Sequence, residues 1–197
     1  MDKYPEIKVA RKTGKEAFHL NGTPLQHDLL SFWQWSASDL VSNAMRGILA
    51  EYIVSSAVGE VGGNRTEWDA YDIETKEGVK VEVKSCAYLQ SWSQKKLSAI
   101  QFSIRPTQSW NPKTNSYSTE VARQSDVYVF CVLQHKTQKT IDPLNMEQWI
   151  FYVLATSKLN QAVGGQKTIT LGKLKELKPD TVSYGELSAS IQQSANK

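Results

Sequence analysis

The sequence predicts an α/β fold, a mixed central β-sheet flanked by helices, on three observations. A helix is expected between Ser36 or Ser38, either of which can cap it, and Gly59, which can end it. A strand pair is expected at 68–75 and 79–86, joined by the turn 76–78. The run 127–133 is continuously apolar, which is typical of a buried central strand. At 197 residues the chain suits one domain, 1–197, with helices on the faces of its sheet.

The predicted helix carries an apolar stripe that contains one acid. Glu51 falls on this stripe, and a buried carboxylate without a partner would be costly. A metal ion or Lys84 could supply that partner, and an ordinary ion pair with Arg46 or Lys80 is the alternative. The residues expected to face the sheet are Leu40, Ala44, Ile48, Ser55 and Val58.

Further elements flank this region. Asn21-Gly22 predicts a hairpin turn after residues 18–20, and strands are expected at 100–105 and 149–154. Residues 118–124 can supply a short helix, and the C-terminal part contains amphipathic segments at 174–177 and 184–192.

Composition points to an intracellular, cytoplasmic protein without a membrane span. No apolar run approaches the roughly 18 residues that a span needs, and the N-terminus shows no apolar signal core. Cys86 and Cys131 lie in strand-like apolar runs, so we expect both to be small buried hydrophobes. The three histidines are scattered, which leaves no zinc-ligand spacing.

The stretch 83–119 contains no Asp or Glu, although the net charge of the chain is only +3. It mixes basic and aromatic residues, which suits contact with phosphates and bases. The alternative is a mildly basic surface over ordinary core aromatics. The residues expected to contact nucleic acid are Trp92, Lys95, Lys96, Gln101 and Arg105.

The predicted strand pair would bring two acids together. Gly78 suits the last turn position, and this register places Ile73 opposite Val81 and Asp72 opposite Glu82. Carboxylates placed so have Cβ atoms about 4.5–5.5 Å apart and repel each other unless a positive charge lies between them. A register slipped by two residues would instead use Glu74 and Asp69.

Lys84 shares a strand face with Glu82, so its ammonium can reach the same point. Two converging carboxylates are hard oxygen ligands, which suit Mg²⁺ or Mn²⁺. Gln101 and Ser103 share another strand face and could line this site, although strand polarity alone explains them equally well.

Together these residues resemble the PD-(D/E)xK phosphodiesterase superfamily of restriction-endonuclease-like proteins. The helical acid is Glu51 in Arg46-Gly47-Ile48-Leu49-Ala50-Glu51, the aspartate is Asp72, and the E-x-K is Glu82-Val83-Lys84. The runs 72–85 and 87–92 are similar to those of small bacterial members. The resemblance covers about 40–133 and implies an αβββαβ core at 36–135, with an extension at 1–35 and a further strand and helices at 136–197. No proline precedes Asp72, and no strong helix is evident between Lys84 and Asp126, where the core expects its second helix.

The resemblance implies a metal-dependent endonuclease that hydrolyses phosphodiester bonds, with DNA favoured over RNA. Asp72 and Glu82 would hold Mg²⁺ (or Mn²⁺), Glu51 would contribute through water, and Lys84 would position or deprotonate the attacking water. A homodimer is expected if both strands of a duplex are cut, since each chain offers one site. One alternative is a catalytically silent nucleic-acid-binding or structural module on the same fold, and another is a binding protein for a non-nucleic ligand.

Overall fold

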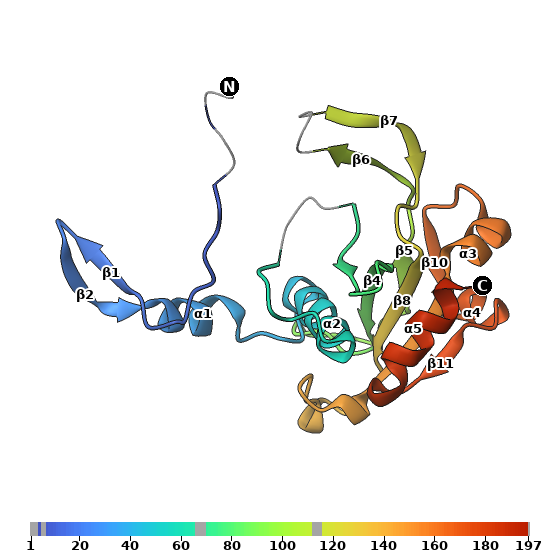
Figure 1. Cartoon of the computed structure of the whole chain (residues 1–197). Helices are drawn as coiled ribbons and strands as arrows, with labels where there is room; N and C mark the ends of the chain where they lie inside the picture. Colours follow the sequence, from blue (N-terminus) through green and yellow to red (C-terminus); the bar gives the residue numbers. More distant parts are fainter. Residues whose placement is uncertain (1–3, 5–6, 66–69, 112–115, 197) are drawn as a thin grey trace. The chain divides into compact units, whose positions relative to one another are not determined.

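The structure is a computed structural model that describes residues 4, 7–65, 70–111 and 116–196. The chain forms two compact units, residues 1–39 with 62–65, and residues 40–61 with 66–197. Figure 1 traces its elements along the sequence. The helices are α1 Leu29–Ala37, α2 Asn43–Val58, α3 Thr156–Val163, α4 Leu171–Glu176 and α5 Leu187–Ala195. The strands are β1 Ala17–Leu20, β2 Thr23–Asp28, β3 Ile73–Glu74, β4 Lys80–Ala87, β5 Gln101–Ser103, β6 Thr107–Asn111, β7 Ser116–Ala122, β8 Val127–Leu133, β9 Trp149–Ala155, β10 Thr168–Thr170 and β11 Asp180–Val182.

The first unit is a hairpin followed by a short helix. Strands β1 and β2 turn at Asn21 and Gly22, whose φ angles are 50° and 81°, so the predicted hairpin is confirmed. Helix α1 starts at Asp28, whose carboxylate accepts a hydrogen bond from the Ser31 backbone N–H at 2.8 Å. The aromatic cluster 32–35 therefore lies inside a helix of its own, and Trp35 is 84% exposed.

Helix α2 opens the second unit and ends where the sequence predicts. Gly59 closes it in the left-handed conformation, with φ at 80°. The predicted start at Ser36 or Ser38 is wrong, because α1 occupies that region and Ser42 caps α2 instead. The Ser42 hydroxyl accepts a hydrogen bond from the Met45 backbone N–H at 3.4 Å.

The predicted apolar stripe of α2 is wrong at Ala44 and Ile48, whereas Val58 packs against the core as predicted. The buried face consists of Arg46, Ala50, Ile53 and Val54, whereas Ala44 is exposed and Ile48 is 38% exposed. The helix is apolar on more than one side, and a buried arginine interrupts the true stripe. Hydrophobic spacing alone therefore favoured the wrong face.

The second unit is built on a five-stranded mixed sheet in the order β11-β9-β8-β4-β3. Strands β4 and β8 are parallel, and the other neighbours are antiparallel. Every residue of β8 is buried, which confirms the predicted central strand. The predicted strand at 149–154 is confirmed as β9, and the short β5 lies inside the predicted 100–105. The observed fold is therefore the predicted α/β class.

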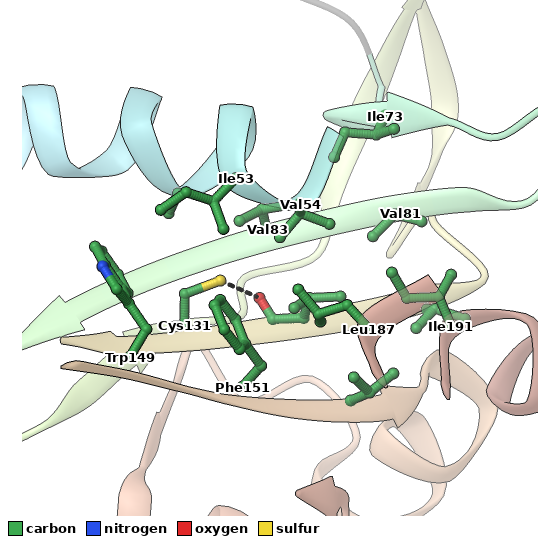
Figure 2. Close-up of a cluster of buried hydrophobic side chains, with 14 of the residues drawn as sticks. Ile53, Val54, Ile73, Val81, Val83, Cys131, Trp149, Phe151, Leu187 and Ile191 are labelled. Carbon is green, nitrogen blue, oxygen red and sulfur yellow. Dashed lines mark hydrogen bonds between the residues drawn. The ribbon is translucent and has the colours of Figure 1, made fainter. Parts of the chain in front are cut away.

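Helices cover both faces of this sheet. On one face, Ile53 and Val54 of α2 and Leu187 and Ile191 of α5 belong to one core cluster with Val83 of β4 (Figure 2). On the other face, α3, α4, β5 and β10 share a second cluster with the opposite side chains of β8 and β9. Among the residues that the structure describes, no helix is long and apolar enough to cross a membrane.

The connection from β4 to β8 differs from the αβββαβ expectation. The predicted short helix at 118–124 is wrong, because 116–122 form β7, which pairs with β6. None of the described residues between 88 and 126 is helical. Tyr117, Thr119 and Val121 alternate along β7, and β-branched and aromatic residues at that spacing favour a strand.

The two cysteines are free thiols. Cys131 is fully buried, as predicted, and Cys86 is half-buried and donates to the backbone oxygen of Gln101. Burial raises the pKa of both thiols above the usual range.

Arg123 is a buried cation that connects the segment after β7 to α3 and β5. Its guanidinium donates to Asn160 Oδ1 at 2.5 Å and to the carbonyl oxygens of Ile104 at 2.8 Å, Gly164 at 2.8 Å and Gln166 at 3.0 Å. Only 8% of the residue is exposed, so this arginine serves the fold and not a ligand surface.

Replacement of this arginine should destabilise the protein strongly. Arg123→Met removes the charge-assisted hydrogen bonds and leaves buried carbonyl groups without donors, which should lower the unfolding free energy by about 3 kcal/mol. Urea denaturation measures the loss. The exposed Arg105 gives the matched control, and an equal effect of Arg105→Met would show that burial does not decide the outcome.

Candidate active site

The β3–β4 hairpin has the predicted register. Ile73 pairs with Val81 and Glu74 with Lys80, and Gly78 lies in the turn with φ at 81°. The two-residue slip is therefore wrong for Glu74, which faces Lys80 and accepts a hydrogen bond from the Tyr71 hydroxyl at 2.5 Å. Asp69, the other acid of the slipped register, lies outside the described residues, as does Trp68, the first residue of the expected strand.

Asp72 comes directly before β3, one residue beyond the pair of Ile73 with Val81. Its backbone N–H donates to the Val81 carbonyl at 3.0 Å, and its carboxylate accepts from the Val83 backbone N–H at 2.7 Å. The side chain thus satisfies a backbone donor of β4 that a longer β3 would have paired. This hydrogen bond holds the carboxylate at the sheet edge, against the residue between Glu82 and Lys84.

Glu82 and Lys84 form an ion pair on one face of β4. Val81 and Val83 belong to the core on the opposite face, as the alternation of a strand requires. The side chains of Glu82 and Lys84 remain 20% and 28% exposed, so a ligand can reach both. Lys84 therefore lies where the sequence predicted, beside the acid.

The surroundings of Asp72 disfavour the ionised form of its carboxyl group. Asp72 as a whole is exposed, but desolvation of its carboxyl group beside β4, followed by the nearby charge of Glu82, raises its pKa from 3.8 to about 6. The hydrogen bond from Val83 and the charge of Lys84 lower this pKa, and Glu51 adds a smaller repulsion. One ammonium group thus does not offset the two carboxylates, and a further cation would stabilise the ionised pair.

This raised pKa has a consequence for stability. The folded state holds the Asp72 proton more tightly than the unfolded chain, so metal-free protein should lose stability as pH rises from about 4 to about 6. Asp72→Asn should remove that decline. Urea denaturation in EDTA across this pH range measures it, and superimposable profiles of the two proteins would contradict the assignment.

The three predicted carboxylates do not form one ligand set. Within the described ranges, no group of three His, Cys, Asp or Glu side chains is placed to hold a metal ion. Glu51 is half-buried on the flank of α2, beside the buried face and not on it. Direct ligation by Glu51 is therefore not seen, and its contribution through water stays a prediction.

Asp72 and Glu82 remain a chemically suitable pair. Mg²⁺ keeps several waters and is commonly bound by one or two carboxylates together with substrate phosphates. Two oxygen ligands at an accessible sheet edge fit that requirement.

The cations considered for Glu51 make other contacts. Arg46 is buried and donates to Asn43 Oδ1 at 2.6 Å, to the Val41 carbonyl at 2.7 Å and to Gln90 Oε1 at 3.2 Å. It thereby ties the start of α2 to the loop after β4. Lys80 lies 5.3 Å from the ring centroid of Tyr71.

Tyr128 is a site neighbour that the sequence did not reveal. The parallel β4–β8 ladder places it beside Glu82, and it is only 3% exposed. Burial, together with the charge of Glu82, raises the pKa of its phenol, so this group stays neutral beside the acids. In the sequence, Tyr128 lies within a continuously apolar run and resembles any core aromatic. Only the pairing of β4 with β8 shows that it lies beside Glu82.

The residues predicted to contact nucleic acid are exposed but have different surroundings. Trp92 is 53% exposed, and Lys95 and Lys96 are exposed in the same loop after β4. Gln101 of β5 donates to Thr168 Oγ1 at 2.8 Å, so strand pairing accounts for its position. Arg105 is exposed after β5. Their contact with nucleic acid stays a prediction.

A comparison with protein families decides the broader relationship. The family model described as bacteriophage T4 endonuclease IV matches residues 26–185, well over half of the chain. The chain belongs to this family. The endonuclease IV match contains α2, the β3–β4 hairpin and the whole five-stranded sheet, and it supports a nuclease that acts on nucleic acid.

The endonuclease IV match also extends past the stretch 40–133 that carries the PD-(D/E)xK resemblance. Strand β9, helices α3 and α4 and strand β11 therefore belong to the same family region as the hairpin. No curated protein sequence matches the chain.

Proposed function

We propose that this protein is a metal-dependent endonuclease of the PD-(D/E)xK type, with Asp72, Glu82 and Lys84 as its catalytic set. Membership of the endonuclease IV family supports the nuclease part of this proposal. The metal and the residue roles rest on the geometry of the β3–β4 edge. DNA is the proposed substrate, carried over from the resemblance to restriction-endonuclease-like proteins.

One observation carries the proposal. The Asp72 carboxylate, directly before the short edge strand, accepts a hydrogen bond from the Val83 N–H, and desolvation together with the nearby charge of Glu82 raises its pKa. Two carboxylates held close together repel each other. A divalent cation bound by both carboxylates would offset this repulsion. A purely structural role would leave the repulsion uncompensated.

Each residue then has a defined task. When bound, the divalent cation would supply an activated water and offset the charge that develops on the phosphate. Asp72 and Glu82 would hold it, the first oriented by the Val83 N–H and the second by the Lys84 ammonium. Lys84 would orient the attacking water and stabilise the extra negative charge on the phosphorus centre. The neutral Tyr128 would keep that side of Glu82 free of bulk water.

The proposal predicts activity that depends on the metal. Purified protein should cleave at least one of supercoiled plasmid, single-stranded DNA and RNA in Mg²⁺ or Mn²⁺, and EDTA should abolish cleavage. Gel electrophoresis of the products measures both rate and substrate class. Cleavage of none of the three, or equal cleavage in EDTA, would refute the metal-dependent mechanism. Cleavage of both duplex strands would make the homodimer the next proposal, because each chain offers one site.

A catalytically silent nucleic-acid-binding module is the second candidate. The ion pair between Glu82 and Lys84 favours it, because a paired lysine already offsets one of the two acids. This candidate predicts nucleic-acid binding without any stabilisation by Mn²⁺. Thermal denaturation with and without the metal separates the two functions.

A further inference from the structure

A hollow of about 520 Å³ lies beside the β6–β7 hairpin. Its walls come from the hairpin, from the segment that leads into it, and from Ala70. Ala70 is two residues before Asp72, so their Cα atoms are at most about 7 Å apart. A strand whose scissile phosphate lies at Asp72 can therefore place a neighbouring nucleotide at this hollow. The wall residues used below are Arg105, Gln108, Trp110 and Tyr117.

Two aromatic rings form part of the wall. Trp110 and Tyr117 face each other across the β6–β7 ladder, with ring centroids 4.9 Å apart and planes inclined by 59°. Tyr117 is 60% exposed and Trp110 is half-buried. No residue of β6 or β7 belongs to either core cluster of the described chain. These rings therefore lie outside the two core clusters, and much of the surface of Tyr117 is exposed beside the hollow.

The polar residues of the wall suit a nucleotide. Among the residues that the structure describes, the hollow is lined by one exposed guanidinium, from Arg105, and one exposed amide, from Gln108, and by no acid. Its wall from Arg105 to Tyr117 falls within the stretch 83–119, which contains no Asp or Glu, while Ala70 and Val121 lie outside that stretch. A cation attracts phosphate, and an amide can donate to and accept from the edge of a base.

We propose that this hollow binds one unpaired nucleobase next to the scissile phosphate. The base stacks on Trp110 and Tyr117, Gln108 contacts its edge, and Arg105 contacts the adjoining phosphate. The occupant is unpaired because neighbouring bases cover both faces of a base inside a duplex, whereas a single strand leaves them free for aromatic side chains. This inference rests on the proposed nuclease function and adds the part of the substrate that the protein reads.

Cleavage mapping on a single-stranded DNA library of random sequence tests the proposal. Wild type should prefer certain bases at one fixed position beside the cut. Trp110→Ala should lose that preference and cut about 5- to 100-fold more slowly, the range for one stacked base. Gln108→Leu, which leaves both rings in place, should alter the preference. Trp35→Ala is the matched control, because Trp35 is an exposed tryptophan outside the hollow and outside the residues predicted to contact nucleic acid, and it should behave as wild type.

Binding in EDTA keeps this test independent of catalysis. Fluorescence anisotropy with a labelled single-stranded oligonucleotide should show weaker binding for Trp110→Ala and Tyr117→Ala than for Trp35→Ala. Equal affinities and unchanged cleavage positions in all variants would overturn the base site and leave the nuclease proposal standing. If unlabelled duplex DNA displaces the labelled oligonucleotide as effectively as unlabelled single-stranded DNA does, the claim that the bound base is unpaired is overturned. If wild type shows no cleavage but Trp110→Ala and Tyr117→Ala still bind more weakly than the control, the nuclease function is refuted and the base site is supported.

Discussion

Lys84→Ala is expected to slow phosphodiester cleavage by about 100- to 1000-fold, the typical cost of removing one group that stabilises transition-state charge. The ammonium group of Lys84 is paired with Glu82 and remains partly exposed. Its removal takes positive charge from the position where the proposed mechanism develops negative charge. Single-turnover cleavage at saturating protein measures the effect on the chemical step, apart from substrate binding.

Two comparisons make the Lys84 result specific. Lys80→Ala removes a lysine from the same strand, one that lies over the Tyr71 ring, and should retain most of the activity. Lys84→Arg keeps the charge but not the compact geometry, so it should recover only part of the rate. Equal rates for wild type and Lys84→Ala would remove Lys84 from the catalytic set.

Asp72→Ala is expected to abolish stabilisation by Mn²⁺. A metal at 100 times its dissociation constant adds about 2.7 kcal/mol to the unfolding free energy, which for a chain of this size raises Tm by about 5–10 °C. The variant lacks one of the two proposed ligands, so its Tm should hardly respond to the metal. The rate of phosphodiester cleavage by this variant should fall as well.

Glu74→Ala is the matched control for this loss. Glu74 is a carboxylate of the same short strand that pairs opposite Lys80 and contacts Tyr71. Its replacement should leave the metal response intact. A full response to Mn²⁺ in Asp72→Ala, or an equal loss in Glu74→Ala, would contradict the assignment of Asp72 as a ligand.

The hairpin that carries the site could be predicted because its determinants are local. Gly78 permits the positive φ of the turn, and alternation along 79–84 separates Val81 and Val83 from Glu82 and Lys84. Together these two features leave one register that keeps apolar residues on one face. The buried strand β8 was equally evident, because a run buried on both faces needs no alternation.

Features that depend on distant contacts were not predictable. The rotation of α2 places Arg46 on the buried face, where it donates to Gln90, 44 residues away. That rotation moves Glu51 to the helix flank, so the expected set of three acids does not form. The role of Tyr128 depends on the parallel pairing of β4 with β8, and the aromatic hollow depends on the β6–β7 hairpin, where the family resemblance led us to expect a short helix. Sequence periodicity does not report pairings of this kind.

The cation at the β3–β4 edge can be observed directly by anomalous X-ray diffraction from crystals soaked in Mn²⁺. The account predicts one strong peak with an oxygen of Asp72 and an oxygen of Glu82 about 2.1 Å away, completed by waters. No peak at this edge, or a peak bound by other residues while Asp72 and Glu82 keep their metal-free contacts, would contradict it.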